Sequence, residues 1–157
     1  MRSLPILLPA GVIRARACPL ASIRQVRTWR LRFVEHAAGA ERLPRPAGWS
    51  DVVDAHAVPC GERTVALTGD GFRAVWDAPY EVEGPVRLRG ELVVDPLDGL
   101  ETTGRIHRLR LLTETVREDA AGERVVALTA RDLSAIPKAV DDDSDRGVLV
   151  DLEIGVA

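Results

Sequence analysis

From Trp49 onward, hydrophobic and polar residues alternate in short runs, which is the pattern of half-buried β-strands. Turns rich in glycine, proline and aspartate separate these runs, and no long amphipathic helix is predicted between them. The pattern predicts about seven short strands, over residues 52–58, 63–68, 72–78, 85–95, 104–116, 123–130 and 147–154. Such a series is typical of an all-β barrel or sandwich, and one short helical turn is expected within residues 132–140.

Two local irregularities can be placed within this pattern. Asp70-Gly71 lies between two strand-like runs and predicts a tight β-hairpin, because the turn needs a positive φ that glycine adopts at little cost. In the run 104–116, Ile106 is out of phase with Leu109, which predicts a β-bulge near His107.

The run 85–95 carries arginines on one face and a glycine in its middle. Arg87 and Arg89 alternate with the apolar residues Val86, Leu88, Leu92 and Val94. We interpret Gly90 as the position where this strand bends around a small barrel, since a glycine relieves the strain of such a bend.

Residues 1–46 differ in character from the rest of the chain. Within residues 22–43, Ile23, Val26 and Phe33 recur near helical spacing, whereas Trp29, Leu31 and Phe33 alternate as in a strand, and both interpretations stay open. Two prolines and a glycine in residues 43–50 indicate a linker or loop. We therefore predict a basic N-terminal extension over 1–46, some of which could be disordered, and a barrel domain over 47–157.

The net charge of −3 is unevenly divided between these two parts. Residues 1–46 hold nine arginines and two glutamates, a net charge of +7, whereas residues 47–157 hold 12 bases and 22 acids, a net charge of −10. A basic extension on an acidic body could bind nucleic acid, a membrane surface or its own acidic domain. The chain has 20 arginines and one lysine, spread along its length, which indicates the codon usage of a GC-rich genome.

The cysteines and the apolar run near the N-terminus indicate the cellular compartment in which the protein is expected. Cys18 and Cys60 are too few for a disulfide framework and are expected to be free thiols in a reducing cytosol. Residues 4–13 have the composition of a signal-peptide core, but prolines interrupt them and Arg14 follows where a cleavage site should begin. No run is long enough to span a bilayer, so we expect a cytoplasmic protein.

Residues 86–96 and 102–113 together resemble the barrel strands of OB-fold proteins, and more weakly those of single-stranded-DNA-binding proteins. The resemblance rests on Gly90, Leu92, Asp95, Pro96, Gly104, Ile106, Leu109, Leu111 and Thr113. It implies a small OB-like β-barrel, although it covers roughly 45 of the 157 residues and leaves no room after Val116 for the middle strands of that family. The layout also looks like that of small uncharacterised proteins from high-GC bacteria, which implies no activity.

The arginines of two successive strands are the candidate nucleic-acid site. If the runs 85–95 and 104–116 pair, five guanidinium groups share one surface, and barrels that bind single strands follow phosphates with such a surface while bases stack on aromatic rings. The candidate residues are Arg87, Arg89, Arg105, Arg108 and Arg110, with Trp76 as the stacking platform. The alternative is a solvated face on which glutamates neutralise the arginines across strands.

Catalytic chemistry has no recognisable sequence signal. No nucleophile elbow, His-Glu-x-x-His or phosphate-binding loop occurs, and no carboxylates form an acid/base pair by spacing. We expect no catalytic residues, no metal and no cofactor. The expected function is a non-enzymatic binding module for single-stranded DNA or RNA, and the alternative is a protein–protein interaction or assembly domain.

Overall fold

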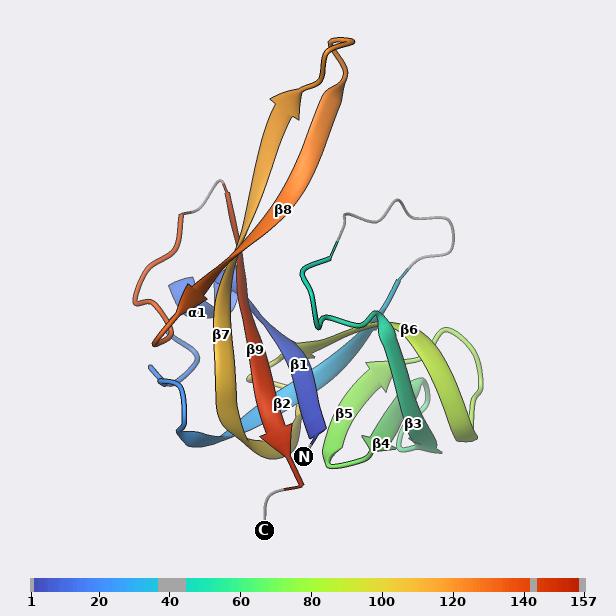
Figure 1. Cartoon of the computed structure of the whole chain (residues 1–157). Coiled ribbons are helices and arrows are strands. Elements are labelled where there is room, and N and C mark those ends of the chain that lie inside the picture. The colour runs from blue at the N-terminus through green and yellow to red at the C-terminus, as the bar shows by residue number, and fades with distance from the viewer. Residues whose placement is uncertain (1, 37–44, 142–143, 156–157) are drawn as a thin grey trace.

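The computed structural model describes residues 2–36, 45–141 and 144–155, which are almost entirely β-structure (Figure 1). In chain order the elements are β1 (Arg2–Pro9), α1 (Ala10–Arg14), β2 (Val26–Glu35), β3 (Val52–Pro59), β4 (Thr64–Gly69), β5 (Phe72–Asp77), β6 (Gly84–Val94), β7 (Leu100–Glu118), β8 (Arg124–Leu133) and β9 (Asp145–Ile154). The all-β prediction is confirmed, and the seven predicted strands correspond to β3–β9. None of the helices in the described ranges is long and apolar enough to cross a membrane.

Eight of these strands close into a barrel in the order β2-β5-β4-β3-β6-β1-β9-β7, after which β7 pairs with β2 again. The closure confirms the predicted small barrel and is consistent with an OB-like barrel, although the OB fold closes five strands. The β1–β6 and β2–β5 contacts are parallel and comprise one residue pair each. β8 pairs with β7 outside the ring.

β2 closes the barrel because it pairs with two successive strands along its length. Its first half pairs with β7 and its second half with β6, and Leu31 lies opposite both Val94 and Leu100. β6 and β7 therefore lie one after the other along β2, and residues 95–99 form the loop that connects them, here called the excursion.

Two arginines of β2 hold this excursion in place. Arg30 donates from Nε to the Gly99 carbonyl at 2.9 Å and from Nη1 to the Pro96 carbonyl at 3.1 Å. Arg32 donates from Nε to Asp95 Oδ2 at 2.8 Å and from Nη1 to Asp77 Oδ2 at 2.7 Å. Burial raises the pKa of the Asp95 carboxyl, but the hydrogen bonds from Arg32 and from backbone N–H groups outweigh it, so the pKa lies below its usual range.

The prediction of an N-terminal extension is wrong for the described residues before position 46. β1 is one of the strands of the barrel wall. It lies between β9 and β6 and pairs with β9 from Arg2 to Pro9. Its alternate residues Leu4, Ile6 and Leu8 are buried, because the prolines interrupt the apolar run without disturbing its period of two. Residues 37–44, where disorder was also considered, lie outside the described residues.

The second N-terminal strand resolves the helix-or-strand alternative in favour of the strand. Trp29, Leu31 and Phe33 alternate along β2 and are at most 2% exposed. Arg32, on the opposite face of β2, binds Asp77 and Asp95 of the acidic body. The basic segment was expected to bind nucleic acid, a membrane surface or its own acidic domain. The structure shows that it binds its own acidic domain.

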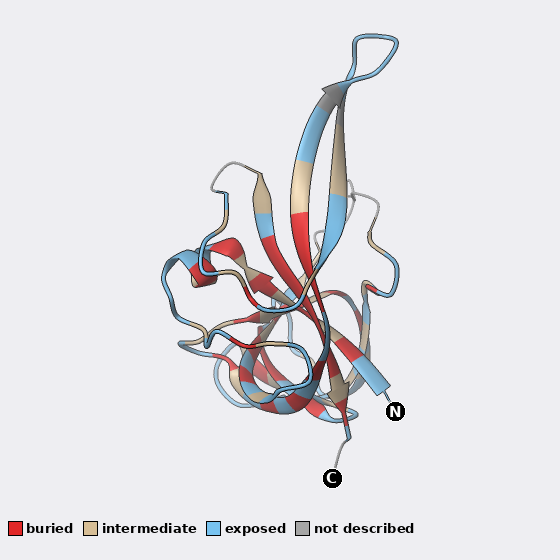
Figure 2. Ribbon diagram, turned by 60° about the vertical axis from the view of Figure 1, so that its left-hand side comes forward, coloured by how far each residue is buried: buried red, intermediate tan, exposed pale blue. Residues whose placement is uncertain are grey.

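The core fills the barrel and extends into the base of the β7–β8 hairpin (Figure 2). A large cluster includes Trp29, Phe33 and Trp76 and draws on both N-terminal strands. A smaller cluster of Trp49, Leu112 and Leu149 lies where the hairpin leaves the barrel. Beyond it, towards the turn, the hairpin residues whose burial the structure describes are half-buried or exposed.

The predicted turn and bulge are both present. β4 and β5 form a hairpin in which Gly69 lies opposite Phe72, and Gly71 has a φ of +81°. The register of β7 against β9 shifts between Ile106 and Arg108, which confirms the bulge. The helical turn expected within residues 132–140 is absent: β8 continues to Leu133, and the segment after it carries no helix.

Gly90 lies where β6 comes into close contact with β2. Here β6 passes from its pairing with β3 to its pairing with β2, and Gly90 lies opposite Glu35. A Cβ at this position would come within 2.2 Å of the Val34 carbonyl oxygen and 2.6 Å of Phe33 Cζ. The glycine is therefore required by the close approach of the neighbouring strand.

We expect Gly90→Ala to lower the free energy of unfolding by about 1–3 kcal/mol, because β2 must move away from β6 to make room for a methyl group. Urea denaturation followed by tryptophan fluorescence measures the change. Gly11→Ala is the control, since a Cβ there would meet its nearest atom, Arg14 Nη2, at 3.9 Å. Equal stability of Gly90→Ala and the unmodified protein would contradict this account of the barrel closure.

Candidate functional site

The five predicted arginines lie on two strands that do not pair side by side. β6 pairs with β3, β1 and β2, whereas β7 pairs with β2, β9 and β8. The pairing on which a shared arginine surface was predicted is therefore absent. Arg87 and Arg89 lie opposite residues of β3, while the arginines of β7 lie opposite β2, β9 or β8.

Two of the exposed arginines are neutralised by aspartates on neighbouring strands. Arg87 donates to both carboxylate oxygens of Asp54 at 2.7 and 3.2 Å, and Arg108 donates to both of Asp132 at 2.7 and 3.3 Å. These hydrogen bonds lower the pKa of each aspartate below its ordinary value. Arg89 and Arg105 are also exposed, and neither forms an ion pair with another described residue.

Arg110 is a buried structural residue. It is 3% exposed, donates from Nη1 to the Ala47 carbonyl at 2.7 Å and forms an ion pair with Asp151 at 3.3 Å. Burial raises the pKa of the Asp151 carboxyl, and the charge of Arg110 opposes this rise. Arg110 Nε and Asp151 Oδ1 have no hydrogen-bond partner among the described residues, so this buried pair is incompletely satisfied.

Trp76 packs inside the barrel at 2% exposure. Its ring meets those of Phe33 and Tyr80 edge to face, each at 5.7 Å between centroids. A base could not stack on it without opening the core. Tyr80, which is 52% exposed, is the member of this aromatic row that reaches the surface.

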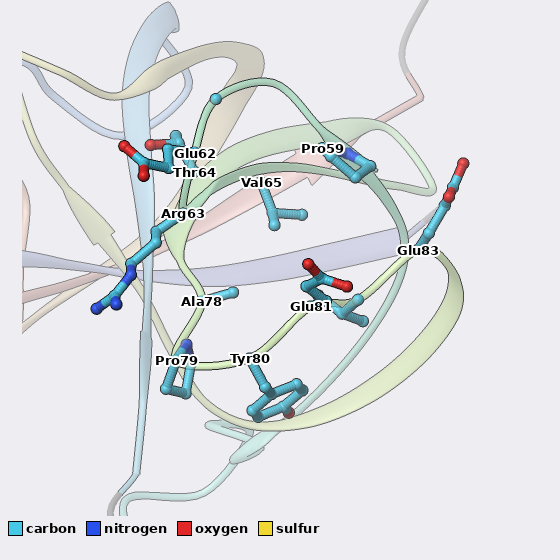
Figure 3. A pocket seen from close by; sticks show the side chains of 12 residues that line it. Pro59, Glu62, Arg63, Thr64, Val65, Ala78, Pro79, Tyr80, Glu81 and Glu83 are labelled. Carbon is cyan, nitrogen blue, oxygen red and sulfur yellow. The ribbon is translucent and has the colours of Figure 1, made fainter.

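A surface pocket of about 750 Å³ lies beside Tyr80, between the β3–β4 turn and the segment before β6 (Figure 3). Val65, Ala78 and the Tyr80 ring line it. Figure 3 shows Glu81 turned towards its middle, whereas Arg63 and Glu83 extend away at opposite sides. Its polar groups do not converge, so it offers no acid/base pair. Within the described residues, no group of histidine, cysteine, aspartate or glutamate side chains could hold a metal ion.

The β7–β8 hairpin is a surface feature that the alternation of apolar and polar residues does not predict. The hairpin projects well beyond the barrel (Figure 1), and its ten residue pairs run from Leu109–Leu133 to Glu118–Arg124. Val116 is 47% exposed near its turn. One signal was present in the sequence: only the short turn at residues 118–122 separates the predicted runs 104–116 and 123–130, which is typical of a hairpin.

The outer edge of β8 presents free main-chain groups. At the turn the Asp119 N–H donates to the Glu123 carbonyl at 2.9 Å, and hydrogen-bonded pairs alternate along an antiparallel ladder. The N–H and C=O groups of Arg124 and of every second residue after it therefore point away from β7. The same phase holds at the far end, where the Ile23 N–H donates to the Ser134 carbonyl at 3.0 Å.

Residues 21–23 cover this edge at the end of β8. Ser22 and Ala135 form a β-bridge, and the Ile136 N–H donates to the Ala21 carbonyl at 2.8 Å. Between Arg124 and Asp132, no other described strand pairs with the outer edge.

We expect the free energy of unfolding of the unmodified protein to fall, relative to that of Asp151→Asn, as the pH rises. The fall begins at about pH 3 and is complete above the raised pKa of the buried Asp151 carboxyl. An unfolded aspartate ionises first, so the stability contributed by the protonated buried form is complete at low pH and lost on ionisation. Urea denaturation of both proteins across this pH range measures the difference.

Glu101→Gln removes the same charge from an exposed position on β7 and serves as the control. A constant stability difference between Asp151→Asn and the unmodified protein at every pH would show that Arg110 fully compensates the burial of Asp151.

Comparison with protein-family models, curated proteins and solved structures gives no match to this chain. Two surface features of the described residues remain as candidate sites: the open edge of β8 and the pocket beside Tyr80. The edge has regularly spaced main-chain donors and acceptors in known phase, whereas the polar groups of the pocket diverge. The edge is therefore the better-defined site.

Proposed function

We propose that this protein is a non-enzymatic protein-interaction module, which binds an extended segment of a partner as an additional strand along β8. The observation that carries the proposal is the open edge from Arg124 to Asp132, whose outward N–H and C=O groups match the hydrogen-bonding needs of another strand. The part of the edge near the turn stands on a hairpin that projects beyond the barrel, whereas the part near Asp132 lies beside the segment of β7 that still pairs with β9.

The composition of β8 supports strand addition. Natural proteins protect long edges with charged side chains, proline, bulges or a covering loop. Residues 124–132 contain no proline, their pairing with β7 has no register shift, and their charged residues Arg124, Arg131 and Asp132 lie at the two ends of the segment. The covering segment 21–23 protects the edge from Ser134 onward.

The placement of the arginines makes a single-stranded nucleic acid a less suitable ligand. The five candidate arginines are distributed over two strands that do not pair, Arg110 is buried, and Arg87 and Arg108 already bind aspartates. Trp76 is inside the core. A ligand that uses main-chain hydrogen bonds does not depend on these side chains.

We expect a fluorescently labelled peptide of alternating threonine and valine, with glutamate at both ends, to bind the protein. Val126→Pro should abolish this binding, because it removes an outward N–H and places a ring on the open edge while leaving the bonds to β7 intact. Val126→Thr keeps the N–H and is the matched control. Fluorescence anisotropy measures binding, and circular dichroism checks that both variants fold.

Equal peptide binding by Val126→Pro and the unmodified protein would refute strand addition at this edge. A labelled single-stranded oligonucleotide at low salt provides the comparison, since phosphate contacts are strongest there. Binding of the oligonucleotide without binding of the peptide would favour the nucleic-acid function instead.

A further inference from the structure

We propose that the strand accepted at this edge is β8 of a second copy of the chain, in an antiparallel pair centred on Leu128. This inference rests on the proposed function and adds the identity of the partner and the register. Two copies paired in this way would be related by a twofold axis, which is the commonest symmetry of protein dimers. Their two hairpins would form one continuous four-stranded sheet.

The extent of the open edge indicates the centre of the pair. The edge begins at Arg124, where β8 starts after the turn, and pairing space ends before Ser134, which already binds Ile23. The residues available to a partner are therefore 124–132, and the middle residue is Leu128. An antiparallel pair centred there uses the whole open edge of both copies.

The phase of the backbone groups agrees with this centre. Leu128, like Arg124, is an even-numbered residue whose N–H and C=O groups point outward, by the alternation set at Asp119 and Glu123. On a twofold axis the two Leu128 residues would exchange both hydrogen bonds. The same geometry repeats at Val126 opposite Ala130, so every outward group finds a partner.

The side chains on this face of β8 are complementary to their own reversed sequence. In the register centred on Leu128, Arg124 of each copy lies opposite Asp132 of the other, and Val126 lies opposite Ala130. Opposite charges directly across an antiparallel pair are stabilising, and like charges are destabilising. The pair therefore contains two arginine–aspartate contacts, and no like charges lie opposite each other on this face.

A shift of register loses this complementarity. Moving the centre by one residue to position 127 places Arg124 opposite Ala130 and Asp132 opposite Gly122, so both charges lose their partner. Asp132 also remains accessible, because its side chain is 68% exposed while it binds Arg108. A carboxylate has further lone pairs with which to accept a second guanidinium.

The apolar part of the face extends the core towards the proposed axis. Leu128 packs against the cluster of Trp49, Leu112 and Leu149 at the base of the hairpin. Val116 lies beside Val126 on the neighbouring strand and is 47% exposed. The β8 strand of the second copy would lie beside Val126 and Leu128, and these apolar contacts add to the main-chain hydrogen bonds, whereas Val116 lies one strand further from the axis.

Charge reversal tests the partner and the register together. We expect the unmodified protein to form a concentration-dependent dimer in sedimentation velocity, and Arg124→Asp and Asp132→Arg each to weaken it by about tenfold or more. An equimolar mixture of the two variants should dimerise again, because one copy then presents two aspartates opposite two arginines of the other. Recovery in the mixture is not expected from a variant that fails to fold.

Cysteine trapping tests the position of the axis. In a Cys60→Ser background, Leu128→Cys should form an intermolecular disulfide under mild oxidation, since Cα atoms of a hydrogen-bonded pair are about 5.5 Å apart. Val126→Cys is the matched control. Its counterpart in the second copy lies four residues away along the strand, about 13 Å, and cannot form the bond.

The outcomes separate this inference from the proposed function. A protein that stays monomeric at every concentration but binds the threonine–valine peptide would overturn self-pairing and leave strand addition standing. A dimer that both charge variants preserve, or that Val126→Cys traps as readily as Leu128→Cys, would overturn the register. Absence of both dimer and peptide binding would overturn the two proposals together.

Discussion

The close approach of β2 to β6 and β7 is the constraint on which the barrel depends. One strand pairs with two successive strands, so its backbone must pass both without a gap. Gly90 and Gly99 allow this, because a Cβ at either position would lie within 2.6 Å of a β2 backbone atom. Arg30 and Arg32 then bind the excursion between β6 and β7 from the same strand. Loss of either feature would weaken the ring where it closes.

The charge distribution of the chain follows from this arrangement. The arginine-rich first part of the sequence contributes two strands to an acidic barrel, and arginines such as Arg2 and Arg32 form ion pairs with aspartates of that barrel. Part of the uneven charge is thus balanced within the fold. Isolated exposed pairs contribute little stability, but the half-buried contacts of Arg32 lie at the point where the barrel closes.

The β7–β8 hairpin is the part of the fold that the barrel does not use. β7 continues beyond the ring, and β8 has a neighbour on one side along most of its length. The same regular pairing that stabilises the hairpin leaves the outward groups of β8 in phase for another strand. This line of main-chain donors and acceptors is the feature on which the proposed strand addition rests.

The sequence by itself determined the local structure: seven strands, the Asp70-Gly71 hairpin and the bulge after Ile106 follow from alternation and from the conformational freedom of glycine. The tertiary structure decided what alternation cannot encode, namely which strands are neighbours. It placed β1 and β2 in the ring, separated Arg87 and Arg89 from the arginines of β7, and buried Trp76 and Arg110. The reason is physical: a period of two shows which face of a strand is apolar, but contacts between distant segments decide what covers that face.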